Sequence, residues 1–321
     1  MDLDQQVPKF IFVVGGVMSS VGKGVTSASI TAILKTRGYN VTNIKCDMYV
    51  NIDAGTMRPT EHGEVFIGED GIEADQDLGN YERFTGNKMT GANYVTTGQV
   101  YQEVIRKERN LEYGGEDVEV VPHVPEEIIR RIMVAQEKAE ADITIIEIGG
   151  TVGEYQVLLF LEAARIMKVR DPHDVAFVLV SYLPLPAHIG EMKTKPTQYA
   201  VRTLNGAGIQ ANFIIARGPE RLDQRRRDKL TEVCNLVEGT VIAAPDCDSI
   251  YDVPLLFHEQ ELDVKLLEIL GLELREAHME PWRDLSSRIK SFDKEIKIAV
   301  VGKYFATGAF TLSDSYISVI E

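Results

Sequence analysis

The sequence contains few cysteines and no long apolar run. Its three cysteines, Cys46, Cys234 and Cys247, lack the spacing of a metal site. An odd and sparse set fits a reducing cytoplasm better than a disulfide scaffold. No stretch approaches the roughly 18 apolar residues that a membrane-spanning helix needs, and residues 1–9 lack the hydrophobic core of a signal peptide. We therefore expect a cytoplasmic protein that does not associate with a membrane.

Positive charge is also scarce. The 34 lysines and arginines are outnumbered by 49 aspartates and glutamates, which gives a formal net charge of −15. Non-specific nucleic-acid binding depends on basic side chains that neutralise phosphates, so this balance argues against a nucleic-acid partner. It does not exclude small phosphate-bearing molecules, which need only a few local cations and backbone N–H donors. The one basic concentration, residues 217–229, has the composition of a solvated helix face.

Apolar, β-branched runs alternate with amphipathic stretches along the chain. This alternation is typical of an α/β fold, in which a mostly parallel sheet is covered by helices on both faces. The expected strands are residues 9–14, 41–45, 118–122, 142–148, 175–182, 212–216 and 240–244. The expected helices include residues 23–37, 126–139 and 224–236.

Two parts of the chain do not follow this alternation. Residues 51–97 are rich in Gly, Asp, Glu and Thr, and we expect a long irregular segment with a functional role. Residues 283–295 are polar and charged, which is typical of a linker, and a new apolar strand is expected at 296–301. We therefore divide the chain into a domain of residues 1–282, the linker, and residues 296–321 as the truncated start of a second domain.

A glycine-rich turn follows the first expected strand. Residues 15–26 read GGVMSSVGKGVT, so a strand, a glycine-rich turn, a lysine and a helix come in succession. Glycines let backbone N–H groups converge on phosphate oxygens, and a helix N-terminus adds partial positive charge. Lys23 would reach the β- and γ-phosphates of a nucleotide. The sequence therefore predicts a P-loop-type phosphate site.

This turn departs from the standard P-loop pattern. Five residues separate Gly16 from Gly22, and Gly24 stands where a serine or threonine usually follows the lysine. The hydroxyl that normally holds Mg²⁺ is therefore missing, and carboxylates are the natural replacement. Two candidates are Asp77 and Glu147. Glu147 ends an apolar strand, where a charge needs a partner and where α/β sheets gather their ligands.

Several sequence blocks, taken together and in order, resemble the CTP synthase family. They are residues 15–24, 51–57, 62–66, 77–84, 147–153, 193–198 and 248–251. With the strand expected at 296, they span most of the chain. The phosphate loop is also similar to those of dethiobiotin synthetase and of the ParA-type switch ATPases, so the resemblance implies a P-loop-type, dethiobiotin-synthetase-like fold.

The resemblance implies a two-step amidation of UTP to CTP. ATP phosphorylates O4 of the uracil base, and ammonia then displaces phosphate at C4. In the family, the ammonia comes from glutamine through a C-terminal class I glutamine amidotransferase domain. The resemblance also implies a homotetramer, Mg²⁺ as cofactor, and CTP as a feedback inhibitor.

The resemblance further implies roles for individual residues. Lys23, Lys45 and His62 would be catalytic, with His62 near the ammonia route, and Asp77 and Glu147 would hold Mg²⁺. ATP would be bound by Ser20, Val21, Gly22, Lys23, Gly24, Val25, Asp77, Pro245, Asp246 and Cys247. UTP or CTP would be bound by Ser19, Glu154, Tyr155, Gln156, Lys193, Thr194, Lys195, Pro196, Thr197, Gln198 and Lys229.

The chain departs from the family pattern at two places. The family usually has Asp-Pro-Tyr after the second strand, whereas this chain has Met48 in the middle position. The family usually has Asp-x-Glu after the loop that ends at Gly153, whereas this chain has Glu154 and Gln156. These acids lie in the region of the family that binds UTP and CTP, so we expect altered feedback by CTP.

Two other functions share the phosphate loop. One is a ParA-type switch ATPase, and the other is a non-catalytic nucleotide sensor or filament subunit on the same fold. A ParA-type ATPase, like dethiobiotin synthetase, has no need of the blocks at 62–66 and 193–198. A sensor also has no need of a full phosphoryl-transfer set of Lys23, Asp77 and Glu147.

Overall fold

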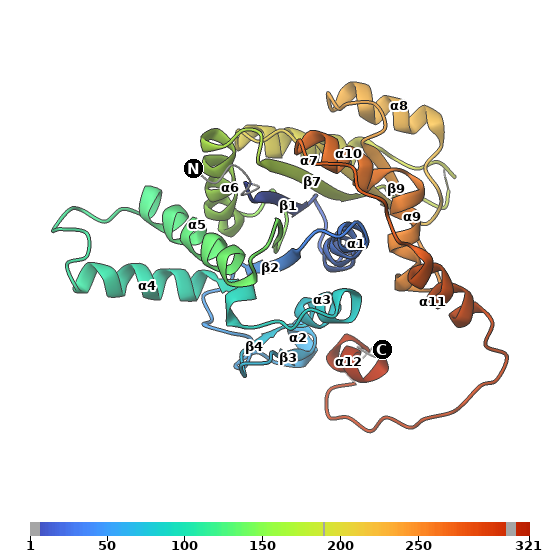
Figure 1. The fold of residues 1–321 in the computed structure, drawn as a ribbon, viewed down its shortest axis with the longest axis horizontal. Coiled ribbons are helices and arrows are strands. Elements are labelled where there is room, and N and C mark those ends of the chain that lie inside the picture. The colour runs from blue at the N-terminus through green and yellow to red at the C-terminus, as the bar shows by residue number, and fades with distance from the viewer. Residues whose placement is uncertain (1–6, 189, 306–312) are drawn as a thin grey trace.

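A parallel sheet forms the centre of the protein. The computed structural model describes residues 7–188, 190–305 and 313–321, so parts of the expectations for residues 1–9 and 296–321 lie outside the described residues. In the part described, seven strands have the order β5-β2-β6-β1-β7-β8-β9, and every pairing among them is parallel (Figure 1). The strands are β1 (Lys9–Gly15), β2 (Val41–Asp47), β5 (Tyr94–Thr96), β6 (Ile143–Ile148), β7 (Val175–Tyr182), β8 (Phe213–Gly218) and β9 (Val241–Pro245). The mostly parallel sheet expected from the sequence is confirmed.

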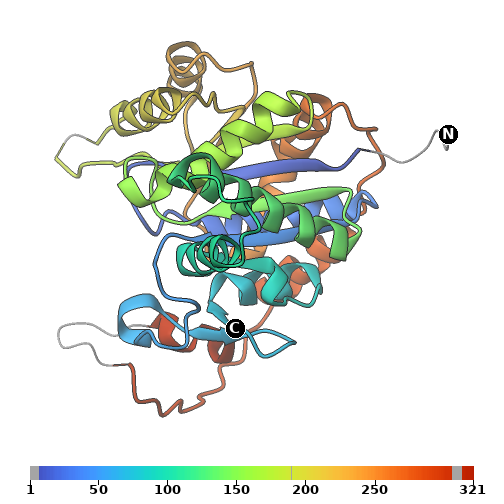
Figure 2. The same cartoon turned by 90° about the vertical axis from the view of Figure 1, so that its left-hand side faces the viewer.

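Helices cover both faces of the sheet (Figures 1 and 2). Side chains of β1 alternate between the two: Phe10 and Phe12 belong to one apolar core, and Ile11 and Val13 belong to the other. The first core includes residues of α4 (Thr97–Arg109), α5 (Val120–Ala139), α6 (Leu158–Arg170), α7 (Lys195–Gly206) and α8 (Gln224–Val233). The second includes residues of α1 (Lys23–Thr36), α9 (Val253–Glu259) and α10 (Leu262–Ile269).

Residues 51–97 are more regular than the sequence predicts. They contain α2 (Pro59–His62), an antiparallel pair of β3 (Val65–Ile67) and β4 (Glu73–Asp75), α3 (Asp77–Thr85) and β5. Tyr81 and Phe84 of α3 pack with Ala28 and Ala32 of α1 in a third small core. Because these elements are short and polar on their outer sides, their periodicity is hidden in the sequence.

The strand predicted at 118–122 is wrong. Helix α5 begins at Val120 instead, and the place of the missing strand in the sheet is taken by β5. Val120 and Val121 are 56% and 46% exposed, so the β-branched run is not buried between helix layers. Pro122 also lacks the N–H that a central strand must donate.

The C-terminal part also differs from expectation. Helix α11 (Glu280–Lys290) occupies much of the predicted linker, and the strand predicted at 296–301 is not formed. Ile296, Ile298 and Val301 are more than 80% exposed, at 82%, 81% and 97%, because no described strand pairs with them. Helix α12 (Ile317–Ile320) follows a short turn at Ser313–Tyr316. The division into two domains stays a prediction. None of the helices in the described ranges has the length and apolarity to span a bilayer.

A buried ion pair fastens the end of α1 to α10. Arg37 Nε lies 2.8 Å from Asp263 Oδ2, and the two side chains are 6% and 1% exposed. His258 Nδ1 lies 3.0 Å from the same carboxylate oxygen. A buried charge that loses its partner strongly destabilises a fold. The pair therefore helps to hold α10 against α1, the helix that follows the phosphate loop.

We expect Arg37→Met to lower the free energy of unfolding by about 3–5 kcal/mol, because it leaves Asp263 buried without its guanidinium. Urea denaturation followed by circular dichroism measures the loss. The matched control is Arg288→Met at an exposed site on α11, which should stay within about 0.5 kcal/mol of the parent. A loss below about 1 kcal/mol in Arg37→Met would show that the pair adds little.

Candidate active site

The phosphate loop joins β1 to α1 at the carboxyl edge of the sheet. Gly22 is the N-cap of α1 and has φ 82°, a left-handed conformation that glycine adopts at little cost. The N-terminus of α1 therefore points its unpaired backbone N–H groups into the loop. The neighbouring strand β6 ends at Ile148, and the loop that follows it faces the phosphate loop, since Lys23 Nζ donates a hydrogen bond of 2.8 Å to Gly150 O.

Gly24 has a steric reason to replace the usual serine or threonine. A Cβ atom at this position would lie 1.9 Å from Asp77 Oδ1, so a larger residue fits only if the Asp77 carboxylate moves. The carboxylate of Asp77, at the start of α3, lies beside the first turn of α1 where a hydroxyl-bearing side chain would stand. The structure thus puts a carboxylate oxygen in place of the missing hydroxyl.

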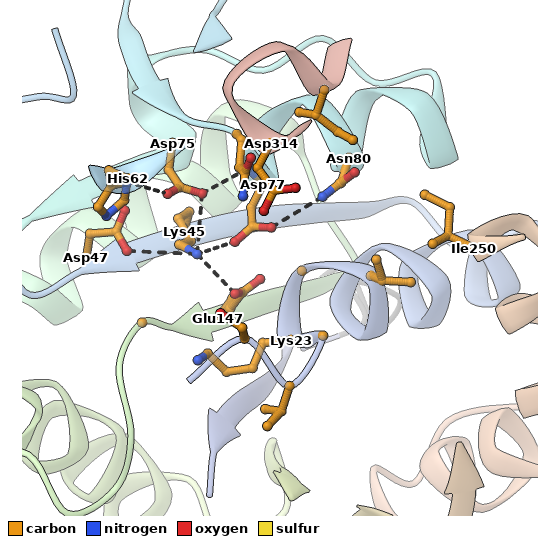
Figure 3. Close-up of a pocket in the computed structure, with 18 of the residues that line it drawn as sticks. Lys23, Lys45, Asp47, His62, Asp75, Asp77, Asn80, Glu147, Ile250 and Asp314 are labelled. Atoms are coloured by element: carbon orange, nitrogen blue, oxygen red, sulfur yellow. Dashed lines mark hydrogen bonds and ion pairs between the residues drawn. The ribbon is translucent and has the colours of Figure 1, made fainter. Parts of the chain in front are cut away.

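Lys45 is the centre of a cluster of carboxylates (Figure 3). Its ammonium contacts Asp77 directly and lies 3.1 Å from Glu147 Oε1, 3.5 Å from Asp75 Oδ1 and 3.8 Å from Asp47 Oδ1. The acids come from three neighbouring places: the end of β2, the end of β6, and the junction of β4 with α3. All four carboxylates and Lys45 are largely buried.

The charges in this cluster shift each other's pKa values. Burial alone would lower the pKa of Lys45, but the carboxylates, Asp75 first, raise it well above the usual value. Burial would raise the pKa of Asp77, but Lys45 lowers it to about 2. Burial and the charge of Asp77 raise the pKa of Glu147 to about 7, and burial also raises the pKa values of Asp47 and Asp75. One ammonium does not neutralise four buried carboxylates.

Lys23 has the opposite environment. Burial lowers the pKa of Lys23, and the charge of Glu147 only partly opposes this effect. Its ammonium is bound to a carbonyl oxygen rather than to a carboxylate. A phosphate group would therefore stabilise the charged form of Lys23 strongly, because a nearby anion offsets the cost of burying an ammonium group.

The residues present fit a magnesium ion. The carboxylates of Asp77 and Glu147, which the sequence predicts as magnesium ligands, both lie against Lys45 and offer hard oxygen atoms. No described group of three or more His, Cys, Asp or Glu side chains is arranged to enclose a metal. Magnesium commonly keeps several waters and binds through one or two carboxylates plus substrate phosphates, which matches this open arrangement.

These side chains line one pocket of about 450 Å³. It brings together the predicted residues Lys23, Lys45, His62, Asp77 and Glu147, which come from separate parts of the chain. Its lining is Ser20, Val21, Gly22, Lys23, Gly24, Val25, Lys45, Asp47, His62, Asp75, Gln76, Asp77, Asn80, Glu147, Gly149, Gly150, Ile250, Asp314, Ile317 and Glu321.

A smaller apolar pocket of about 90 Å³ borders the start of α1 at Gly22, Val25 and Thr26. Pro245 and Cys247, two of the residues predicted to bind ATP, line it together with Val25 and Phe257. Asp246 does not line it; its carboxylate instead lies 2.9 Å from Arg217 Nη2.

The residues predicted for the pyrimidine nucleotide lie outside these two pockets. Thr197 is buried and shares a hydrogen bond of 2.9 Å with Ser181 at the end of β7. Glu154 Oε1 accepts a hydrogen bond of 2.8 Å from Thr151 N, and Glu154 Oε2 accepts one of 2.6 Å from Gln156 Nε2. The exposed members are Ser19, Tyr155, Gln156, Lys195 and Lys229, and the partly or fully buried ones are Glu154, Lys193, Thr194, Pro196, Thr197 and Gln198. Their role stays a prediction.

Sequence reasoning missed three contributors to the main site. Asp47 ends β2 as Glu147 ends β6, so the rule that identified Glu147 also applies to it. Asp75 lies two residues before Asp77 in a segment expected to be irregular. Tyr81 donates a hydrogen bond to Glu147 Oε2 from a buried position on α3, and nothing in the sequence indicates this contact.

Comparison with known proteins identifies similar sequences and folds. Residues 9–272 match the family model described as "CTP synthase N-terminus". Relatives named CTP synthase from Thermococcus gammatolerans and Pyrococcus abyssi are both 48% identical over 98% of this chain, covering 58% and 57% of those proteins. A solved structure of FtsY from Mycoplasma mycoides is 12% identical, with a TM-score of 0.38 over 81% of this chain and 68% of that chain.

The chain spans little more than half the length of the curated relatives it matches. The matched region contains the phosphate loop, the carboxylate cluster around Lys45 and the loop that follows β6. On the family model and the identity to these relatives, the chain belongs to the CTP synthase family.

Proposed function

We propose that the chain catalyses the ATP-dependent amination of UTP to CTP through a 4-phosphorylated UTP intermediate, with ammonia as the nitrogen donor. The observation that supports this most is the pocket in which Lys23, on the phosphate loop, lies opposite the carboxylate cluster of Lys45, Asp77 and Glu147. Such a pocket can bind a triphosphate and a divalent cation side by side.

Each residue has a defined task in this reaction. The N–H groups at the start of α1 would bind the ATP phosphates, and Lys23 would exchange the carbonyl of Gly150 for the transferred phosphoryl group. Lys45 stays charged because the neighbouring carboxylates raise its pKa, so it can stabilise negative charge on the phosphorylated base. Mg²⁺ held by Asp77 and Glu147 would neutralise charge on the phosphate oxygens. Phosphorylation turns a poor leaving oxygen into a good one, which ammonia then displaces.

The nucleoside parts need separate binding regions. The small apolar pocket with Pro245 and Cys247 suits a purine ring, and the exposed lysines Lys195 and Lys229 suit the triphosphate of UTP. We propose that CTP inhibits by binding at Glu154 and Gln156, where an amide stands in place of the usual second carboxylate. The switch ATPase and the nucleotide sensor are disfavoured by the family match.

The direct test is to mix the protein with ATP, Mg²⁺, UTP and ammonium chloride and to separate nucleotides by ion-exchange chromatography. We expect CTP, ADP and phosphate in equal amounts. ATP hydrolysis without CTP would favour a switch ATPase, and nucleotide binding without any turnover would favour a sensor.

We also propose that the protein is a homotetramer, as in the family. We propose a cytoplasmic location because its three cysteines are all free thiols. Nucleotides that bind across subunit contacts stabilise the assembly by linkage. Sedimentation velocity should therefore show a larger share of tetramer with saturating ATP and UTP than without them. ADP alone serves as the control. A monomer under saturating ATP and UTP would refute the tetramer.

A further inference from the structure

The hydroxyl of Tyr81 contacts one of the two carboxylates that would hold Mg²⁺. Tyr81 lies on α3 and is 0% exposed, and its hydroxyl donates a hydrogen bond to Glu147 Oε2. Glu147 lies near the end of β6, and its side chain is 1% exposed. Glu147 lines the main pocket, whereas Tyr81 is not part of that lining. The phenol therefore reaches the carboxylate from behind the pocket and not from within it.

Each oxygen of the Glu147 carboxylate has its own donor. Lys45 Nζ, on β2, lies 3.1 Å from Oε1, and Tyr81, on α3, donates to Oε2. A carboxylate on its own rotates readily about the bond that joins it to the side chain. Two donors from different elements fix both its position and its plane. Each oxygen has two lone pairs, so each keeps one for a cation.

Helix geometry explains how Tyr81 reaches this place. Asp77 is the first residue of α3, and Tyr81 follows four residues later, so the two side chains lie on the same face of the helix. The ring of Tyr81 packs against Ala28 and Ala32 of α1, which are also four residues apart. Their small side chains leave room for the ring. The helix that follows the phosphate loop thus sets the position of the phenol.

The same helix also supports the other carboxylate. Asp77 begins α3, and Asn80 Nδ2 donates a hydrogen bond of 3.3 Å to Asp77 Oδ1 (Figure 3). One helix therefore carries Asp77 directly and holds Glu147 through Tyr81. The relative placement of the two carboxylates depends on this helix.

We propose that Tyr81 is a positioning residue whose hydroxyl fixes the orientation of the Glu147 carboxylate and thereby strengthens the binding of a nucleotide together with its divalent cation. The proposal rests on the part of the proposed function that assigns Mg²⁺ to Asp77 and Glu147, and not on the amination of UTP. Partners that orient metal-binding side chains typically contribute about 10–100-fold to metal affinity.

The substitution Tyr81→Phe tests this role, because it removes the hydroxyl and keeps the ring that packs on α1. The probe is AMPPNP, an ATP analogue that is not hydrolysed at the γ-phosphate, titrated calorimetrically with Mn²⁺ and, separately, with EDTA. We expect the affinity for AMPPNP with Mn²⁺ to fall by about 10–100-fold. The affinity without metal should stay unchanged, because the N–H groups of α1 still bind the phosphates. An equal loss under both conditions would indicate a displaced phosphate loop and overturn the proposal.

The matched control is Tyr39→Phe. Tyr39 is 3% exposed, and its hydroxyl donates to the backbone carbonyl of Glu273, outside the pocket. Both variants lose one buried hydrogen bond, so both should unfold at a slightly lower temperature. We expect weaker Mn²⁺-dependent binding in Tyr81→Phe alone. The same loss in Tyr39→Phe would show that reduced stability, and not the orientation of Glu147, is the cause.

A double-mutant cycle tests whether Tyr81 acts through Glu147. In a Glu147→Ala background there is no carboxylate to orient, so Tyr81→Phe should lower the affinity for AMPPNP with Mn²⁺ no further. A further loss in this background, similar to that in the parent, would overturn the proposal.

The binding measurements need no turnover, so the two proposals can fail separately. Unchanged Mn²⁺-dependent affinity in Tyr81→Phe would overturn the inference even if the parent forms CTP. A loss of that affinity in Tyr81→Phe, in a protein that forms no CTP, would overturn the proposed amination and support the inference.

Discussion

Lys23→Ala should lower kcat for CTP formation by about 10²–10³-fold or more and leave the fold intact. Loss of one preorganised charged donor at a reacting group costs this much in comparable sites. The structure gives a physical reason. Burial keeps the Lys23 ammonium poorly solvated, and among the described residues its hydrogen-bond acceptor is Gly150 O. The Lys23 ammonium should therefore stabilise the phosphoryl group most when negative charge develops on it during transfer.

The measurement is the rate of CTP formation at saturating ATP, UTP and ammonium, with thermal unfolding as the check on folding. The matched control is Lys138→Ala on an exposed position of α5, which should keep the parental rate. Near-full activity in Lys23→Ala would show that the phosphate loop does not hold the transferred group.

The 321-residue chain should make CTP from ammonium chloride but not from glutamine. Glutamine hydrolysis in this class needs a thiolate nucleophile at an accessible turn with a histidine base nearby. Cys46 is buried on β2, and its burial and Asp47 raise the pKa of its thiol. Burial raises the pKa of Cys234 to about 11, and burial also raises the pKa of Cys247, the one exposed cysteine.

The test compares the two nitrogen donors with ATP, Mg²⁺, UTP and GTP present. A separately added glutaminase is the positive control, because it releases ammonia from glutamine and should restore CTP formation. CTP formed from glutamine without it, above the level expected from contaminating ammonia, would mean that one of the three cysteines acts as a nucleophile.

The parts of the site that sequence reasoning found are those with strong local patterns. The phosphate loop has its glycines and lysine next to a continuous apolar strand, and Glu147 ends another such strand, so both could be placed on the carboxyl edge of a parallel sheet. The parts it missed depend on tertiary contacts. Asp75 reaches Lys45 only through the β3–β4 pairing, and Tyr81 reaches Glu147 only because α3 packs on α1.

The same distinction explains the errors in the fold. The run at 118–122 has the β-branched composition of a strand, but whether a strand forms depends on a neighbour, and here the sheet edge beside β2 is taken by β5. Residues 296–301 have an equally apolar pattern and no described neighbour with which to pair. Composition therefore indicates the capacity to pair, and the availability of a partner decides the outcome.

The contact between Gly24 and Asp77 has a consequence for how such chains vary. A side chain at position 24 and the carboxylate at position 77 would fill the same space, since a Cβ atom would come within 1.9 Å of Asp77 Oδ1. A serine or threonine can therefore be introduced after Lys23 only if the Asp77 carboxylate moves or a smaller residue stands at 77. The two positions are therefore expected to vary together. A motif search that requires a hydroxyl after the lysine will miss proteins in which a carboxylate from a different helix fills that space.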